Sequence, residues 1–294
     1  MHVARGGIWD KDFVLAAPAL RTLPVNLEVS TMSDLDRNYT SPFGRAAGRA
    51  DAAAVDAGLR AYMLRIYNYM SIGLAITGLA ALGVYMAAVT GDASAAAARV
   101  GNTYLTSFGV AMFVSPLKWV FILAPLVMVF VISFGINRLK PSTAQMLFWA
   151  FSALMGISLS SIFLIYTHTS IVRVFFITAA AFGALSLYGY TTKRDMTGMG
   201  SFLMMGLFGI IIASLVNLFV ASSMLQFVVS VVGVLVFAGL TAWDTQRLKN
   251  DYIYGYGGQG GDVAERAAIT GALSLYLNFI NLFTLLLQLL GQRD

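Results

Sequence analysis

The residues that could carry chemistry in this chain are the few charged and amide side chains within, or at the ends of, long apolar segments. Asp244 and Arg138 stand near segment ends, and Asn217, Asn278 and Asn281 lie deeper. A charge at the centre of a membrane helix costs about 2.5–3.5 kcal/mol on insertion scales, so charged residues retained there are functional candidates. The chemistry that these side chains can supply is ion pairing and weak cation coordination.

Asp244 and Arg138 are predicted to be partners. Successive membrane segments run in opposite directions, which places the end of the second segment and the end of the sixth at the same face. Two alternatives stay open. Asp244 can cap its helix or form an interfacial ion pair with Arg247 or Lys249 instead, and Arg138 can be a cation that only sets the orientation of the chain in the membrane.

Arrangements typical of enzymes are absent from the sequence. The chain has no cysteine, which excludes thiolate zinc sites, iron–sulfur clusters and cysteine nucleophiles. The two histidines, His2 in the tail and His168 in an expected outer loop, form no His-Glu-x-x-His pair, and no Gly-x-Ser-x-Gly motif occurs. The glycine-rich YIYGYGGQGG lacks the Lys-Ser/Thr ending of a phosphate-binding loop and is expected to be flexible. We therefore expect neither enzymatic activity nor a bound cofactor.

The composition predicts a membrane protein. Of 294 residues, 58% are hydrophobic and 11% are charged, whereas soluble domains carry about 25% charged residues. The net charge of +5 does not indicate a nucleic-acid partner, because the Lys and Arg residues lie at segment ends rather than in a patch with aromatics. The expected partner of most of the surface is the lipid bilayer.

Seven apolar segments are long enough to cross about 30 Å of hydrocarbon, which takes about 20 helical residues. Each must be helical, since backbone polar groups inside a bilayer have to be paired within the segment. The expected segments are 66–89, 117–136, 144–166, 171–191, 202–221, 224–243 and 267–290. The expected fold is therefore an all-α integral membrane bundle of seven helices (66–291), preceded by a disordered cytoplasmic tail (1–45) and an amphipathic juxtamembrane helix (46–65).

The cations predict the orientation of the chain. The larger group flanks the segments on the side of the N-terminus: Arg49, Arg60, Arg65, Arg138, Lys140, Lys193, Arg194, Arg247 and Lys249. The smaller group lies on the other side: Arg99, Lys118, Arg173 and Arg293. Because positively charged loops stay inside the cell, we expect a cytoplasmic N-terminus and an external C-terminus.

Small residues recur at helical spacing in two segments. Ser152, Gly156 and Ser160 repeat every four residues in the third segment, and Ala179 and Gly183 do so in the fourth. Such faces let helix backbones approach closely in a membrane. We interpret both as helix-packing faces.

Four stretches resemble the Bax inhibitor-1 family, whose bacterial members include YccA-like proteins. They are IYNYMSIGLAITGLAA (66–81), MGISLSSIFLIYT (155–167), FAGLTAWDTQRLKNDY (237–252) and GALSLYLNFINLF (271–283). They follow the order of that family's helices, and the resemblance covers about residues 60–291, essentially the whole membrane part.

The resemblance implies a seven-helix fold whose last helix is central, and a role as a proton-sensitive calcium leak channel or a membrane homeostasis factor in a bacterial inner membrane. In such channels an aspartate pair on the sixth and seventh helices shares a proton, and an arginine at the end of the second helix binds that pair. Those positions fall on Asp244, Asn278 and Arg138, which are the expected residues of the ion pathway and its gating.

Asn278 departs from the family pattern, because it stands where the second aspartate is expected. Two close carboxylates cannot both ionise cheaply, which lets the pair sense protons. With Asp244 as the single carboxylate, ionised beside a cation, we expect blunted pH sensing. Asn278 can still donate a hydrogen bond or offer a carbonyl oxygen to a cation. A calcium site at Asp244 would be weak, since calcium takes six to eight oxygens.

The alternative function is a non-conducting regulator that binds and restrains a membrane protease, as YccA-like members are thought to do. The long N-terminal region is the feature that favours this alternative, because it offers a docking segment that a simple channel does not need.

Overall fold

The computed structural model describes residues 42–101, 103–135, 139–256 and 261–293. The chain divides into two units, Met1–Ala50 and Asp51–Asp294, and the second is the subject below. Of the tail expected at 1–45, residues 1–41 lie outside the described residues, and 42–45 belong to the first described helix.

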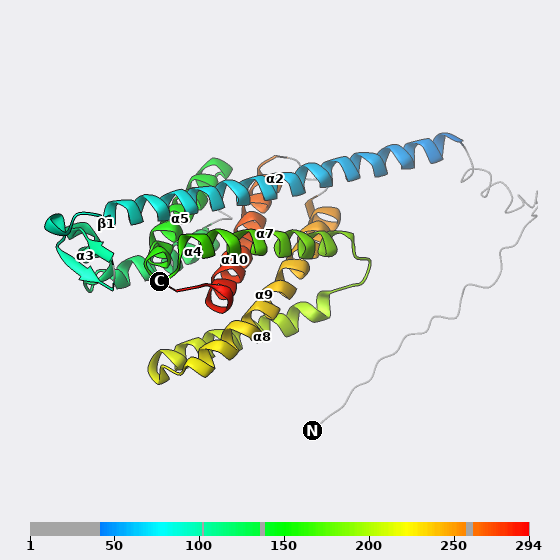
Figure 1. The fold of residues 1–294 in the computed structure, drawn as a ribbon. Helices are drawn as coiled ribbons and strands as arrows, with labels where there is room; N and C mark the ends of the chain where they lie inside the picture. The colour runs from blue at the N-terminus through cyan, green and yellow to red at the C-terminus, as the bar shows by residue number, and fades with distance from the viewer. Residues whose placement is uncertain (1–41, 102, 136–138, 257–260, 294) are drawn as a thin grey trace, which may run out of the picture. The chain divides into compact units, whose positions relative to one another are not determined.

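The described part of the chain is almost entirely helical (Figure 1). Its helices are α2 (Pro42–Ala88), α3 (Ser107–Phe113), α4 (Lys118–Gly135), α5 (Pro141–Leu159), α6 (Ile162–Ile165), α7 (His168–Thr191), α8 (Thr197–Val220), α9 (Ser223–Asp251) and α10 (Asp262–Leu290). The 3₁₀ turn η1 (Ala93–Ala95) and the π-helical turn η2 (Tyr252–Tyr256) interrupt the connections, and three short strands are β1 (Val89–Thr90), β2 (Ala98–Val100) and β3 (Thr103–Leu105).

Seven of these helical stretches are long and apolar enough to cross a membrane, as predicted. They are Ala54–Ala88, Lys118–Gly135, Pro141–Ile165, His168–Thr191, Thr197–Val220, Ser223–Gly255 and Asp262–Leu290. The all-α membrane bundle expected from the sequence is thus confirmed. The segments expected as juxtamembrane helix and first span lie on one helix, α2, with no break at residue 65.

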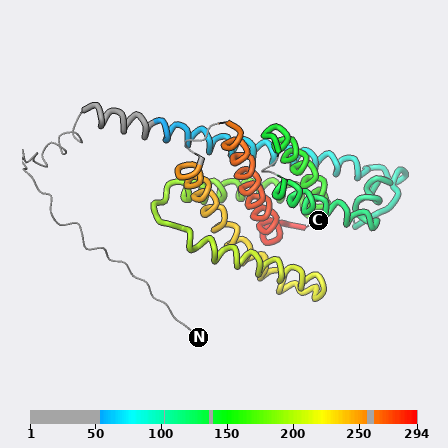
Figure 2. Tube along the Cα trace, turned by 180° about the vertical axis from the view of Figure 1, so that it is seen from behind, coloured from blue at the N-terminus to red at the C-terminus, as the bar shows by residue number. Residues whose placement is uncertain are grey.

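The last helix, α10, is the most enclosed. In its most apolar stretch 56% of the residues are buried, compared with 11–39% in the other six spans. The ribbon in Figure 1 and the tube in Figure 2 both show it between α2 and the antiparallel pair formed by α8 and α9. The predicted central position of the last helix is therefore confirmed.

The predicted boundaries were wrong around the last connection. The sixth span was expected to end near residue 243, but α9 continues to Asp251 and the chain then forms η2. The seventh span was expected from residue 267, but α10 begins at Asp262, whose first turn carries Asp262 and Glu265. Acidic residues are stabilised at the positive end of a helix dipole, so the polar residues belong to the helix rather than to a loop.

The connection expected as the first loop contains a small antiparallel sheet with the strand order β1–β3–β2. The register pairs Val89 with Leu105 and Arg99 with Tyr104. Strands of two or three residues are too short to show an alternating hydrophobic pattern, which is why the sequence does not reveal them. His168, expected in a loop, is instead the first residue of α7, with its ring 5.4 Å from that of Tyr85.

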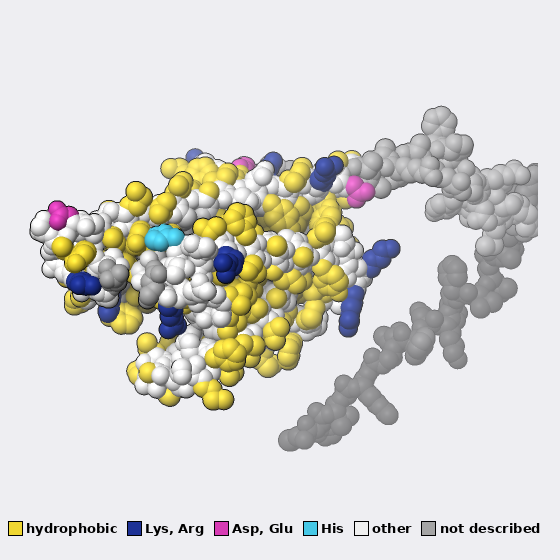
Figure 3. Space-filling model, viewed as in Figure 1, with side chains coloured by type: hydrophobic (Ala, Val, Ile, Leu, Met, Phe, Trp, Pro, Cys, Tyr) yellow, Lys and Arg dark blue, Asp and Glu magenta, His cyan; other side chains and the backbone are white. Residues whose placement is uncertain are grey.

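The distribution of apolar and charged side chains on the surface is that expected of a membrane-spanning protein. Apolar side chains cover much of the face drawn in Figure 3, and most charged side chains gather toward its two ends. Large apolar side chains of α8 are widely exposed, among them Phe202, Met205 and Phe219. Contiguous apolar surface of this kind marks contact with lipid or with another protein.

Tyr276 of α10 organises the core. Its side chain is fully buried, its hydroxyl lies 2.6 Å from Oγ1 of Thr77 on α2, and its ring meets Phe148 and Phe151 of α5 edge-on at 5.7 and 5.6 Å. A buried phenol needs such a hydrogen-bond partner. This contact fixes α10 against α2 and α5.

The two small-residue faces behave differently. A Cβ added at Gly156 of α5 would lie 2.4 Å from the backbone oxygen of Thr77 on α2, so this glycine is required by close backbone contact. A Cβ added at Gly183 of α7 would have nothing within 4 Å. The interpretation of Ala179 and Gly183 as a packing face is therefore wrong at Gly183, which borders a cavity.

We expect Gly156→Ala to lower the free energy of unfolding by about 1–3 kcal/mol, because overpacking forces the two backbones apart. The measurement is thermal unfolding in detergent. Gly209→Ala on α8 is the matched control, since a Cβ there meets nothing within 4 Å. Equal stability of the two variants would show that α2 and α5 are not in close contact.

Candidate functional site

The site centres on Asp244 of α9 and Asn278 of α10, each only 6% exposed. Nδ2 of Asn278 donates a hydrogen bond to Oδ2 of Asp244 at 2.7 Å. The structure thus brings together two of the three residues expected in the ion pathway. Arg138, the third, lies outside the described residues.

Arg247 forms an ion pair with Asp244. Its Nη2 lies 2.7 Å from Oδ1 of Asp244, one turn earlier on the same helix, and its guanidinium stacks on the ring of Trp243 at 4.7 Å. This is one of the alternatives that the sequence left open. Oδ1 is buried, and the ion pair is its only polar contact among the described residues. Arg247 is therefore the cation that a transported ion would have to replace at Oδ1.

Contacts with α7 and its C-terminal turn hold Asp244 in place. A Cβ at Gly189 would lie 2.1 Å from the backbone oxygen of Ala242, so α7 and α9 touch through their backbones. Nε2 of Gln246 donates to the carbonyl of Arg194 at 2.7 Å, and its Oε1 accepts from the backbone N–H of Met196 at 2.9 Å. These bonds fix the rotation of α9 immediately beside Asp244.

A polar cavity of about 440 Å³ opens beside the site, between α2, α9 and α10. Its polar lining includes Arg247, Asp251, Arg266, Thr270 and Ser274. Ser274 is one helical turn before Asn278 on α10, and Arg247 is the ion-pair partner of Asp244, so the cavity borders the residues next to the Asp244–Asn278 contact. We name it the inner cavity.

Leu139, the first described residue after Arg138, lies beside a residue that lines this cavity. Nη1 of Arg266, which lines the inner cavity, is 3.4 Å from the carbonyl oxygen of Leu139. Leu139 is the next residue after Arg138 in the sequence. The prediction that Arg138 contacts Asp244 stays a prediction.

Beyond the site, α9 and α10 are sealed by apolar side chains. This apolar block is made mainly by Leu203 and Ile210 of α8, Val236, Phe237 and Leu240 of α9, and Leu282 and Leu285 of α10. Its side chains are almost completely buried. No hydrated ion can pass such a block without separation of the helices.

Polar side chains return at the far end of the same helices. Oε1 of Gln288 accepts hydrogen bonds from Nε2 of Gln226 at 2.6 Å and from Oγ of Ser230 at 2.9 Å, and Nδ2 of Asn217 donates to Gln226 at 3.0 Å. These residues line a second polar cavity of about 400 Å³. Along α9 and α10 the order is therefore polar cavity, buried carboxylate, apolar block and polar cavity.

Sequence reasoning missed Thr270 and Ser274, because serine and threonine are common in membrane helices and carry no charge. Asn281, a candidate from the sequence, is not part of the site. Its Nδ2 donates to the carbonyl of Leu277 on its own helix at 2.8 Å. Asn217 belongs to the far polar cluster instead.

No resident metal site is evident in the described part of the chain, where no three His, Cys, Asp or Glu side chains cluster. At Asp244 each carboxylate oxygen faces a nitrogen donor. A calcium ion needs six to eight oxygens. A cation that binds Asp244 would therefore have to displace Arg247.

Asp195 offers a contrast outside the membrane-spanning helices. It is exposed in the turn between α7 and α8, where its Oδ1 accepts hydrogen bonds from the hydroxyl and the backbone N–H of Thr197 at 2.6 and 2.9 Å. These bonds favour the ionised form and hold the pKa of Asp195 below its usual value. It is a hydrated carboxylate, unlike Asp244.

The fold and the site together define a polytopic helical membrane protein with a buried carboxylate between its two most enclosed helices. Comparison with known protein families supports this class. The chain belongs to the Bax inhibitor family described as "Inhibitor of apoptosis-promoting Bax1", whose model matches residues 59–294.

Curated relatives span nearly the whole chain. An uncharacterized protein of Caulobacter vibrioides is 45% identical over 262 residues, covering 88% of this chain and 98% of the relative. The inner membrane protein YbhL of Escherichia coli is 43% identical over 242 residues, covering 81% of this chain and 94% of the relative. An uncharacterized protein of Rickettsia prowazekii is 46% identical over 238 residues, covering 81% and 92%.

Proposed function

We propose that the chain is a cation leak pathway, with calcium as a transported ion, in a bacterial inner membrane and with its N-terminus in the cytoplasm. The observation that carries the proposal is the buried carboxylate of Asp244 between the inner cavity and the apolar block. Ionisable residues kept inside a membrane bundle mark ion pathways, because their burial is costly. The excess of cations at the end of the bundle that holds Arg247 supports the orientation.

The mechanism follows from competition for Asp244. Arg247 occupies the carboxylate in this arrangement, and Asn278 donates its amide hydrogen to the other oxygen. An entering cation replaces the guanidinium at Oδ1, and rotation of the Asn278 amide presents a carbonyl oxygen to it. With so few protein oxygens the ion keeps most of its water, so binding is weak and release is fast.

Passage beyond Asp244 requires the apolar block to part. The described arrangement is the closed one, since Phe237 and Leu282 pack within the block that separates the two polar cavities. The far cluster around Gln288 then receives the ion on the outer side. Arg138, placed by the sequence at the inner end, is proposed as a second cation that holds Asp244 in the closed state.

Two substitutions are expected to change flux in opposite directions. Asp244→Asn removes the charge that attracts the ion and should lower calcium flux about tenfold or more, which is the rate equivalent of about 1.4 kcal/mol. Arg247→Gln removes the competing cation and should raise the flux. The measurement is calcium entry into liposomes that contain the purified protein and a trapped indicator.

Asp195→Asn is the matched control, because it removes an exposed carboxylate at the same end of the bundle. It should conduct like the wild type. Proteoliposomes with folded wild-type protein and no flux above protein-free liposomes would contradict the leak pathway and favour the non-conducting regulator of a membrane protease.

A further inference from the structure

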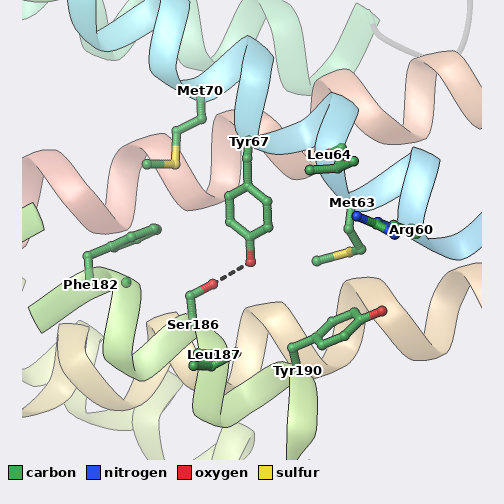
Figure 4. Close-up of a pocket in the computed structure, with 10 residues that line it drawn as sticks. Arg60, Met63, Leu64, Tyr67, Met70, Phe182, Ser186, Leu187 and Tyr190 are labelled. Carbon is green, nitrogen blue, oxygen red and sulfur yellow. Dashed lines mark hydrogen bonds between the residues drawn. The ribbon is translucent and has the colours of Figure 1, made fainter. Parts of the chain in front are cut away.

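A third cavity lies between α2 and α7 and has a volume of about 500 Å³; its lining residues are shown in Figure 4. Its walls are mostly apolar, with Met63, Leu64 and Met70 from α2 and Phe182 and Leu187 from α7. We name it the α2–α7 cavity. Asp244, Asn278 and Arg247 are not among the residues that line it.

The cavity has one charged end. Arg60 lies at its rim, and among the described residues it forms no ion pair and no hydrogen bond. Ten residues separate Arg60 from Met70, which is about 15 Å along a helix at 1.5 Å per residue. That length is half of a hydrocarbon core of about 30 Å. The cavity thus extends along α2 from its cationic rim over a length comparable to one leaflet.

The cavity is open to the side. Leu64 and Leu187, which line it, are 52% and 64% exposed. Gly183 contributes no side chain, and a Cβ there would meet nothing within 4 Å. Both helices are membrane spans. A lipid can therefore enter from the bilayer without passing through the bundle.

The polar groups of the cavity suit a lipid headgroup and glycerol region. Tyr67 points from α2 to Ser186 of α7, and their hydroxyls are hydrogen-bonded (Figure 4). Tyr190 lines the cavity near Arg60, and Nζ of Lys249 donates to its carbonyl at 2.8 Å and lies 5.3 Å from its ring centre. Arg60 and Lys249 therefore place two positive charges at or near the rim.

We infer that the α2–α7 cavity binds an anionic phospholipid of the inner leaflet. Its phosphate lies at Arg60, and one acyl chain occupies the space beside Gly183, between Met70 and Phe182. Basic pockets between membrane helices on the cytoplasmic side bind anionic headgroups in this way. The bound lipid then bridges α2 and α7.

The test uses two variants that separate headgroup from acyl chain. Phosphatidylglycerol or phosphatidylcholine is titrated into the delipidated full-length protein, and bound lipid is counted by native mass spectrometry. Arg60→Gln should weaken phosphatidylglycerol binding about fivefold, as expected for the loss of one basic contact near the membrane surface. Gly183→Leu fills the cavity and should abolish the tightest binding of either lipid.

Matched controls lie on the same or a similar helix. Arg65→Gln changes another exposed arginine of α2 that does not line the cavity, and Gly209→Leu adds a side chain on α8 where space is open. Both should bind phosphatidylglycerol like the wild type. Equal binding of the two lipids by the wild type, or retention of lipid by Gly183→Leu, would overturn the inference, and the unfolding temperature shows that each variant is folded.

Discussion

Replacing Asn278 with aspartate is expected to turn a leak that varies little between about pH 6 and 8 into one that changes several-fold over that range. In the wild type Asp244 contributes one carboxylate to the contact with residue 278, and this carboxylate faces Arg247 and the amide of Asn278. Arg247 and the amide of Asn278 stabilise its ionised form, whereas burial opposes it by removing water. Wild-type flux should therefore not follow the pH in this range.

The Asn278→Asp variant replaces a hydrogen-bond donor, 2.7 Å from Oδ2 of Asp244, with a second carboxyl group. At low pH the pair keeps one proton, so the introduced carboxyl group donates as the amide did and the closed arrangement persists. At high pH both groups are charged and repel each other across α9 and α10. Flux should thus rise with pH, measured as calcium entry into proteoliposomes at several pH values.

Asn281→Asp is the control for this titration. Asn281 lies one turn further along α10 and is hydrogen-bonded to its own helix rather than to Asp244. It adds an acid to the same helix without creating the pair. A wild type that already responds steeply near neutral pH would show that a group other than Asp244 senses protons. Equal responses of the two variants would contradict a coupled titration of Asp244 with the carboxyl group introduced at position 278.

The number of membrane helices could be predicted from the sequence, because hydrocarbon excludes charged residues and open backbone, whereas the central position of the last helix was implied only by the resemblance to the Bax inhibitor-1 family. The helix ends could not. Hydropathy reports where the bilayer stops, whereas α9 continues to Asp251 as a polar helix beyond it. The small sheet β1–β3–β2 could not be predicted either, because its strands are too short to show an alternating hydrophobic pattern in the sequence.

The site could be predicted in part. Asp244 and Asn278 are conspicuous because buried polar residues are costly in a membrane, and the structure places them in contact. The choice between Arg247 and another cation depends on helix rotation and rotamer, which the sequence does not specify. Gly183 shows the same limit, because a small residue can either allow close packing or leave a cavity.

The most direct test of the proposed ion pathway uses the absence of cysteine from the chain. Ser274→Cys places a single thiol in the inner cavity, and Gly198→Cys places one at the start of α8, outside that cavity. A positively charged thiol reagent then adds a cation at each position, and calcium flux is measured before and after complete modification. The account predicts that flux through Ser274→Cys falls about tenfold or more, the rate equivalent of about 1.4 kcal/mol, and that flux through Gly198→Cys is unchanged. Unchanged flux through fully modified Ser274→Cys would contradict a pathway that reaches Asp244 through the inner cavity.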